Sequence, residues 1–261
     1  MIEFHKTAIV SDKAKIGDGT VIGPFVYIED DVIIGDNCYI GPQVCIYNGA
    51  RIGNNVKIYQ SASVSHRPQD LKYNNEKSYL EIGDNTTVHE FVTLHRGTGE
   101  NGITKIGANC LLMAYVHVAH DCIVGDGTIL ANAVQLAGHV EIGKNTTMGG
   151  AAVVHQFNKV GSFAMVRGGS KVAKDVPPYC MAADDPLKYM GLNKVGLMRR
   201  GFSNDDITLI KDAYKILYYS GMNVSHALNE LKFKYKNNKL VEDIILFVEN
   251  SKRGIIPPNR V

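Results

Sequence analysis

Residues 16–58 read IGDGTVIGPFVYIEDDVIIGDNCYIGPQVCIYNGARIGNNVKI, and in this stretch an isoleucine stands at every sixth position. The rhythm extends from Val10 to Val172, where 25 of the 28 positions in this phase are aliphatic or methionine. An α-helix repeats every 3.6 residues and a strand every two, so neither explains a period of six. A β-helix does, because each hexapeptide forms one side of a triangular coil. The chain is therefore predicted to be a solenoid.

Small or β-branched residues usually stand two positions before each aliphatic residue, as at Ala8, Thr20 and Cys38. Because the side chains of a strand alternate, both positions are expected to point into the coil. Three hexapeptides close one turn, so residues eighteen apart should stack about 4.8 Å apart along the coil. Glycine often follows the aliphatic residue, as at Gly17 and Gly35, and we expect the tight corner to need a positive φ there.

The three exceptions to the rhythm are Asp70, Glu76 and Glu100, which lie in the stretches 65–79 and 98–104. Both stretches keep the phase of the repeat. We expect them to be loops that leave the coil, and loops on a rigid scaffold are where ligand contacts gather.

The repeat stops after Val172, in a stretch that contains Pro177 and Pro178, and proline cannot donate to a central strand ladder. A mainly β fold with two domains is predicted, namely a β-helix over residues 1–175 and a helical domain over residues 176–261. Amphipathic patterns predict helices over 204–220, 224–235 and 240–252. Ser203 and Asp206 form a capping box before the first of these helices.

The composition excludes several classes of protein. A formal net charge of +2 gives no reason to expect nucleic-acid binding. The chain has no long uncharged apolar run and no signal-peptide core at its N-terminus, so we expect no membrane span and a cytoplasmic location. The five cysteines lack CxxC spacing and are predicted to be buried small residues, with no metal and no cofactor implied.

Histidines recur in the later turns of the predicted coil. The eighteen-residue rule aligns them in two neighbouring columns, His120–Gly138–Gln156 and Asp121–His139–Phe157. Each histidine taken alone would be read as a solvated surface residue. Together, a histidine, a carboxylate and a close-approach glycine are the parts of a general base, its electrostatic support and an oxyanion site. No serine or cysteine nucleophile is in register, which favours direct attack by a substrate group.

Seven segments resemble the UDP-N-acetylglucosamine O-acyltransferase family of the hexapeptide-repeat acyltransferases, which begins lipid A biosynthesis. They are QDLKY at 69–73, HRGT at 95–98, AHDC at 119–122, AGHV at 137–140, HQF at 155–157, DVPPY at 175–179 and RRGF at 199–202. The resemblance implies a left-handed parallel β-helix and a homotrimer with active sites between subunits. It also implies transfer of a 3-hydroxyacyl chain from acyl carrier protein to the 3-hydroxyl of UDP-N-acetylglucosamine.

The resemblance also implies roles for single residues. His120 would be the general base, Asp121 its supporting carboxylate, and the N–H of Gly138 the donor to the oxyanion. The residues expected to bind the substrates are Gln69, Asp70, Lys72, His117, His139, His155, Gln156, Asn193, Arg199 and Arg200. Gly168 matches the position that limits acyl-chain length, and it leaves room for a long chain.

Two departures from the family pattern affect these expectations. Val195 stands two positions after Asn193, where the family often has an acidic residue. The resemblance therefore does not imply the whole nucleotide contact for this chain. Arg167 stands where a second glycine is usual, next to the chain-length position. Neither the length of the acyl chain nor the affinity for carrier protein follows from the sequence.

Three alternatives remain open from the sequence. The acceptor could be a 3-amino UDP-sugar, which would give an amide. His117, His120 and His139 could instead hold zinc, as in a γ-type carbonic anhydrase, although their spacing differs from the usual one. A non-catalytic solenoid that only binds partners is the third alternative.

Overall fold

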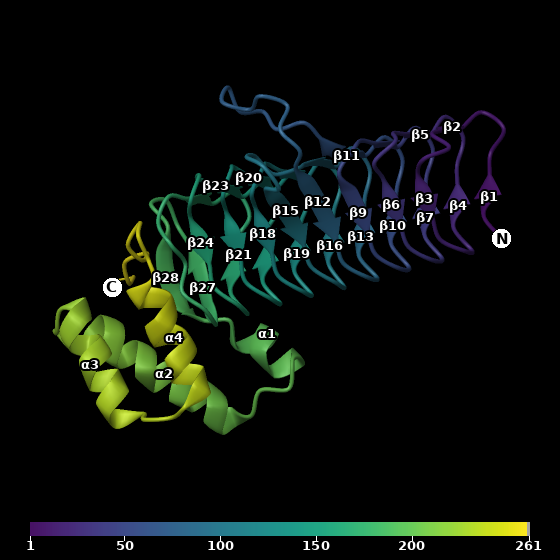
Figure 1. The fold of residues 1–261 in the computed structure, drawn as a ribbon. Helices are drawn as coiled ribbons and strands as arrows, with labels where there is room; N and C mark the ends of the chain where they lie inside the picture. The colour runs from purple at the N-terminus through teal and green to yellow at the C-terminus, as the bar shows by residue number, and fades with distance from the viewer. Residues whose placement is uncertain (260–261) are drawn as a thin grey trace.

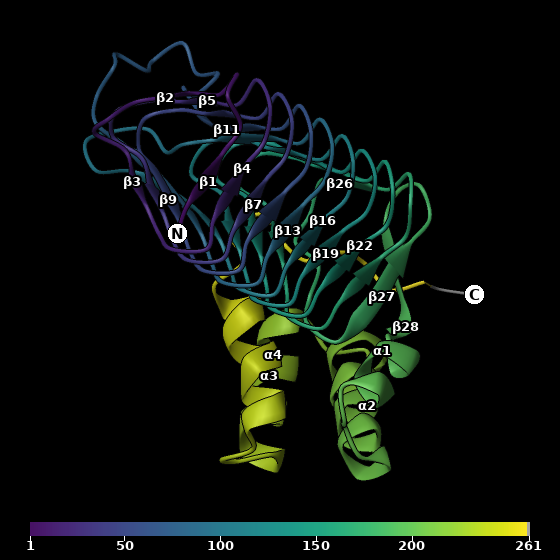
Figure 2. The same ribbon diagram turned by 90° about the vertical axis from the view of Figure 1, so that its right-hand side faces the viewer.

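A three-sided coil of short parallel strands forms most of the molecule (Figures 1 and 2). The computed structural model describes residues 1–259. The first sheet contains β1 (Glu3–Phe4), β4 (Val21–Ile22), β7 (Tyr39–Ile40), β10 (Lys57–Ile58), β13 (Thr87–Val88), β16 (Leu111–Leu112), β19 (Ile129–Leu130), β22 (Thr147–Met148), β25 (Met165–Val166), β27 (Cys180–Ala183) and β28 (Lys188–Leu192).

The other two faces of the coil are built in the same way. The second sheet contains β2 (Ile9–Val10), β5 (Tyr27–Ile28), β8 (Cys45–Ile46), β11 (Ser63–His66), β14 (Thr93–His95), β17 (His117–Val118), β20 (Gln135–Leu136), β23 (Val153–Val154) and β26 (Lys171–Val172). The third contains β3 (Lys15–Ile16), β6 (Ile33–Ile34), β9 (Ala50–Ile52), β12 (Tyr79–Ile82), β15 (Ile103–Ile106), β18 (Ile123–Val124), β21 (Glu141–Ile142) and β24 (Lys159–Val160).

The coil is left-handed. In Figure 2 the N-terminus faces the viewer, and the chain passes counterclockwise from β1 to β2 to β3 as it recedes. The predicted fold is confirmed, and with it the departure from the right-handed crossovers that most parallel sheets use.

The register confirms the eighteen-residue stacking and the two loops. Val21 pairs with Tyr39, eighteen positions later. Where the loops intervene the spacing lengthens, since Lys57 pairs with Thr87 and Thr93 with His117. The longer loop, residues 67–78, projects from the coil after β11 (Figure 1). The shorter loop, residues 96–102, follows β14.

The aliphatic residues of the repeat fill the inside of the coil. From Ile22 onward they are at most 4 % exposed. The second inward site is also buried, and Cys38, Cys110 and Cys122 occupy it as free thiols. Burial raises the pKa of Cys122 to about 12, so its thiol is an inert apolar group at neutral pH. The prediction for these cysteines is confirmed.

The expected role of the glycines is wrong. Gly17 and Gly35 do not have a positive φ; the left-handed residues stand two positions later, for example Gly19 and Asn37. A Cβ on Gly35 would lie 2.7 Å from the backbone of Gly53 in the next turn. These glycines are therefore required by close approach of successive turns, and the corner conformation falls mainly to asparagine and other non-glycine residues.

The chain after the coil is helical and lies at the C-terminal end of the solenoid, below it in Figures 1 and 2. The helices are α1 (Lys194–Arg199), α2 (Asn204–Tyr219), α3 (Val224–Lys234) and α4 (Lys239–Glu249). The three predicted helices and the capping box of Ser203 and Asp206 are present, while α1 was not predicted. Within residues 1–259, no helix combines the length and apolarity needed to cross a membrane.

Tyrosines join the helices to the last turns of the coil. The Tyr214 hydroxyl donates to the Pro178 carbonyl (2.5 Å), and the Tyr179 hydroxyl donates to Asp243 Oδ2 (2.6 Å). The first sheet itself continues past residue 175 through β27 and β28, which pair antiparallel. The division between residues 175 and 176 stays a prediction.

Candidate active site

The two predicted columns lie at the corner between the second and third sheets, here called corner 2 and marked by Asp121, His139 and Phe157. These three residues occupy the same left-handed position in successive turns. The His139 N–H donates to the His120 carbonyl (3.0 Å), and the Phe157 N–H donates to the Gly138 carbonyl (3.2 Å). The rings of His139 and Phe157 stack with centroids 4.7 Å apart. Regular turns of the coil thus bring residues from three hexapeptides into one patch.

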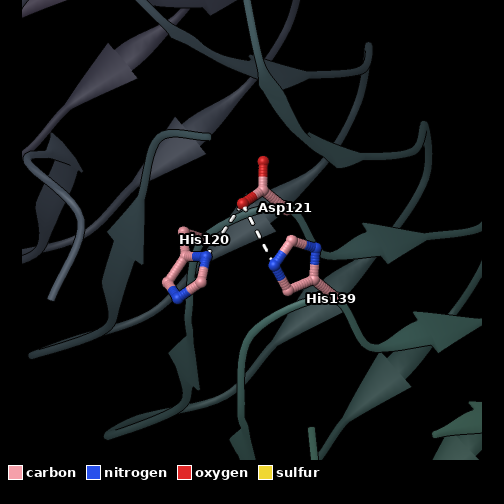
Figure 3. Close-up of side chains that lie close together, drawn as sticks. All are labelled: His120, Asp121 and His139. Carbon is pink, nitrogen blue, oxygen red and sulfur yellow. Dashed lines mark hydrogen bonds and ion pairs between the residues drawn. The ribbon is translucent and has the colours of Figure 1, made fainter. Parts of the chain in front are cut away.

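The Asp121 carboxylate lies between two imidazoles (Figure 3). Its Oδ2 is 2.8 Å from His120 Nδ1 and 3.7 Å from His139 Nε2. Burial by itself would raise the pKa of Asp121, but hydrogen bonds from His120 and Thr98 outweigh it and hold that pKa below its usual value. An ionised carboxylate only accepts hydrogen bonds, so His120 carries its proton on Nδ1. Its Nε2 is then the basic nitrogen.

Gly138 lies directly against the His120 ring. A Cβ at this position would come within 2.6 Å of His120 Cε1 and 2.7 Å of Nε2. In the part of the chain that the structure describes, the Gly138 N–H has no hydrogen-bond acceptor, whereas the N–H groups of Ala137 and His139 both do. A base and a free N–H donor therefore stand side by side, which is the arrangement needed to deprotonate a nucleophile and stabilise the oxyanion it forms.

A cavity of about 510 Å³ opens in front of His120. It brings together many of the predicted residues across the longer loop and the coil. Its lining is Gln69, Asp70, Leu71, Lys72, His95, His117, Ala119, His120, Ala137, Gly138 and Gln156. Asp70 Oδ2 lies 3.9 Å from His120 Nε2, so the longer loop reaches over the basic nitrogen.

Two predicted histidines stand outside this lining. His139 contacts Asp121 from the turn that follows, and His155 Nδ1 lies 3.1 Å from the Gln156 carbonyl on the exposed side of the corner.

His95 and Thr98 belong to the HRGT motif, but the sequence predicted no role for either residue. His95 is 4 % exposed, and its Nδ1 lies 2.7 Å from the Arg67 carbonyl. Burial lowers the pKa of His95 to about 4, so it is neutral at pH 7. The signal was present, since the inserted loop lengthens the stacking interval here to 24 residues, which places His95 over Ala119 beside His120.

The remaining candidates lie at other corners of the same chain. Arg200 hydrogen-bonds Asn145 Oδ1 and the Gly127 carbonyl (3.2 Å), at the corner between the third and first sheets. Asn193 Nδ2 donates to the Phe163 carbonyl (2.9 Å) at that same corner, and Arg199 ends α1 close by in the chain. Gly168 lies at the corner between the first and second sheets. One chain therefore does not bring these residues to His120.

The departures from the family pattern lie on the surface. Val195 is 59 % exposed in α1, and Arg167 is exposed beside Gly168. Neither residue belongs to the lining of the cavity at His120.

The three-histidine set of the zinc alternative does not come together. Among the described residues, the metal-ligand atoms that converge belong to His120, Asp121 and His139, within 4.8 Å of one another. His117 points its Nδ1 at Thr93 Oγ1 instead (2.8 Å).

Two family profiles match the chain. The profile described as "Udp N-acetylglucosamine O-acyltransferase; Domain 2" matches residues 175–256. The profile "Bacterial transferase hexapeptide (six repeats)" matches residues 13–48, 34–66 and 103–134.

Curated relatives cover the chain from end to end. A protein of Aliarcobacter butzleri named acyl-[acyl-carrier-protein]–UDP-N-acetylglucosamine O-acyltransferase is 49% identical over 261 residues, 100% of both chains. A protein of the same name from Thiobacillus denitrificans is 48% identical over 257 residues, 98% of this chain and 100% of its own.

Solved structures show the same fold. The UDP-N-acetylglucosamine acyltransferase of Bacteroides fragilis superposes with a TM-score of 0.94 at 44% identity, covering 97% of this chain and 99% of its own. The Francisella novicida enzyme superposes with a TM-score of 0.96 at 38% identity, covering 98% of this chain and 95% of its own.

Proposed function

Because the chain belongs to the UDP-N-acetylglucosamine O-acyltransferase family, we propose that it transfers a 3-hydroxyacyl chain from acyl carrier protein to the 3-hydroxyl of UDP-N-acetylglucosamine, the first step of lipid A biosynthesis. The observation that carries the proposal is the contact between His120 and Gly138, with Asp121 bonded to the far side of the imidazole.

His120 acts as the general base. Its Nε2 takes the proton of the 3-hydroxyl while the hydroxyl oxygen bonds to the thioester carbonyl carbon. The Gly138 N–H stabilises the resulting oxyanion, and Asp121 stabilises the imidazolium. When the carbon–sulfur bond breaks, the leaving sulfur takes the proton from the imidazolium, so the base is restored and the carrier protein leaves as a thiol. A thioester needs no further activation.

The longer loop and the walls of the cavity bind the acceptor and the acyl group. Gln69, Asp70 and Lys72 face His120 from the loop, and His117 and Gln156 complete the cavity from the coil. His139 and His155 extend the binding surface along corner 2. Asp70, 3.9 Å from His120 Nε2, is placed to accept a hydrogen bond from a sugar hydroxyl next to the reacting one.

The active enzyme is a homotrimer with each site shared between two chains. Asn193, Arg199 and Arg200 lie at a different corner from His120, and Gly168 lies at the third. A substrate that reaches both His120 and the arginines must therefore bridge two coils, and three prisms around a threefold axis bring unlike corners together. In that arrangement the arginines of one chain bind the diphosphate held over His120 of the next, since a guanidinium forks onto two phosphate oxygens.

Gly168 sets the length of the acyl chain. Gly168 has no side chain, and a Cβ there would lie 3.0 Å from the Gly150 carbonyl oxygen, so a larger residue would crowd this corner of the coil. The protein acts in the cytoplasm, where its five free thiols stay reduced.

An acyl-transfer assay tests this function. The protein is incubated with UDP-N-acetylglucosamine, or with its 3-amino counterpart, and a panel of 3-hydroxyacyl carrier proteins, and the products are identified by mass spectrometry. We expect an ester at the 3-oxygen, and we expect His120→Ala to lower kcat by about 10²–10⁴-fold. An amide formed in preference to the ester would mean that the acceptor is the 3-amino UDP-sugar. His120→Ala with full activity would mean that His120 is not the general base.

A further inference from the structure

The carboxylate behind His120 is held by a residue outside the coil. The Thr98 N–H donates to Asp121 Oδ1 (3.0 Å), and its hydroxyl donates to Asp121 Oδ2 (2.6 Å). Oδ2 is the oxygen that lies 2.8 Å from His120 Nδ1. Thr98, in the shorter of the two loops, thus hydrogen-bonds both carboxylate oxygens of Asp121, the residue that orients His120.

The two hydrogen bonds from Thr98 determine which of two imidazoles the Asp121 carboxylate faces. His139 Nε2 lies 3.7 Å from Asp121 Oδ2, on the other side of the carboxylate from His120 (Figure 3). A carboxylate held only by its own side-chain torsions could turn toward either ring. Two hydrogen bonds from one residue fix the plane of the carboxylate, and Thr104 Oγ1 fixes the Asp121 backbone by accepting its N–H (2.7 Å). Directed in this way, Oδ2 stays on His120.

The shorter loop is in turn tied to the longer one. Glu76 accepts the Gly99 N–H on Oε1 (2.9 Å) and the Asn74 N–H on Oε2 (2.7 Å). The loop that carries Asp70 and Lys72 and the loop that carries Thr98 therefore form one hydrogen-bonded unit above His120.

We propose that Thr98 is a positioning residue for the acyl transfer, which holds the Asp121 carboxylate on His120 and couples it through Gly99 and Glu76 to the substrate-binding loop. The inference rests on the proposed function and adds to it a residue that acts through Asp121. Thr98 itself does not line the cavity.

Thr98→Val and Thr98→Ser test the proposal, because valine keeps the branched shape and serine keeps the hydroxyl. In steady-state assays we expect Thr98→Val to lower kcat about tenfold, with KM for the UDP-sugar changed less than about twofold. Thr98→Ser should restore most of the rate. The matched control is Thr87→Val, the same change in β13 on the first sheet, which should leave kcat unchanged.

A double-mutant cycle separates positioning from a structural role. If Thr98 acts through Asp121, Thr98→Val should lower kcat about tenfold in the wild-type background and less than about twofold in the Asp121→Asn background. Equal losses in both backgrounds, or a Thr98→Val variant as fast as wild type, would overturn the proposal.

A readout without turnover keeps this test apart from the proposed function. The His120 Nδ1 proton, bonded to a carboxylate, should give a downfield nitrogen-bound resonance in wild type and Thr98→Ser that moves upfield in Thr98→Val. The same resonance in all three proteins would overturn the positioning role, whatever the substrate. A wild-type protein that fails to acylate UDP-N-acetylglucosamine would refute the proposed function but not the positioning of Asp121 by Thr98.

Discussion

There is no room for a methyl group between Gly138 and the His120 imidazole, because a Cβ on Gly138 would lie 2.6 Å from His120 Cε1. The structure gives no positive φ at Gly138, so alanine is compatible with the backbone and acts only through this contact. We expect Gly138→Ala to displace the base from the Gly138 N–H and to lower kcat by about 10²-fold. The thermal midpoint should stay close to wild type. Steady-state kinetics and calorimetry check both, and a Gly138→Ala enzyme with wild-type kcat would contradict the oxyanion role.

Arg96 anchors the longer loop to the coil. Its guanidinium donates to the carbonyls of Asn48 (3.1 Å) and Ser65 (3.0 Å) and to the Tyr73 hydroxyl (2.9 Å). Lysine carries the charge but not the fork that reaches three acceptors. We expect Arg96→Lys to raise KM for the UDP-sugar about tenfold and to change kcat less, because the loop that carries Asp70 and Lys72 loses its attachment. A change in kcat with an unchanged KM would place Arg96 with the base instead.

His95 makes the stability of the protein depend on pH. Its pKa is lowered to about 4 by burial, whereas an unfolded histidine titrates near 6.5. Between these values the unfolded chain binds the extra proton, so stability rises with pH there. The contribution of His95 to the free energy of unfolding, roughly 3 kcal/mol per chain, is fully present above pH 6.5 and is lost as pH falls toward 4. The lowered pKa of His117 acts in the same direction.

His95→Asn tests this by removing the titration. Its side-chain amide keeps a donor for the Arg67 carbonyl, which lies 2.7 Å from His95 Nδ1. Urea unfolding at pH 7 and pH 4.5 should show a smaller loss of stability for the variant than for wild type. Equal losses in the two proteins would mean that His95 does not carry this dependence.

The coil could be predicted because its rule is strictly local. One aliphatic residue every six positions defines the faces, and counting by eighteen along the sequence then places His120 against Gly138. The same count missed His95, because the inserted loop lengthens the pairing interval to 24 residues, as between Thr93 and His117. A repeat predicts neighbours only as far as its register is unbroken.

Other features depend on contacts that no periodicity records. The left-handed corners fall on residues such as Phe25, Tyr115 and Asp121, where the coil imposes a conformation that these residues rarely adopt alone. Helix α1 spans six residues, too few for an amphipathic pattern to show. Thr98 gains its importance from two hydrogen bonds to Asp121 across 23 positions, and only the path of the ejected loop brings them together.

The separation of Arg200 from His120 gives the sharpest test of the proposed site between two chains. His120→Ala and Arg200→Ala should each be nearly inactive alone, since in the proposed trimer every site would then lack one of these two residues. Co-expressed with different tags, they should assemble mixed trimers in which about a third of the sites pair an intact His120 with an intact Arg200 from the next chain. Activity should recover to about that fraction of wild type, measured on trimers purified through two different tags. Mixed trimers without any recovery would mean that both residues serve one site within a single chain, which their positions at different corners of the prism oppose.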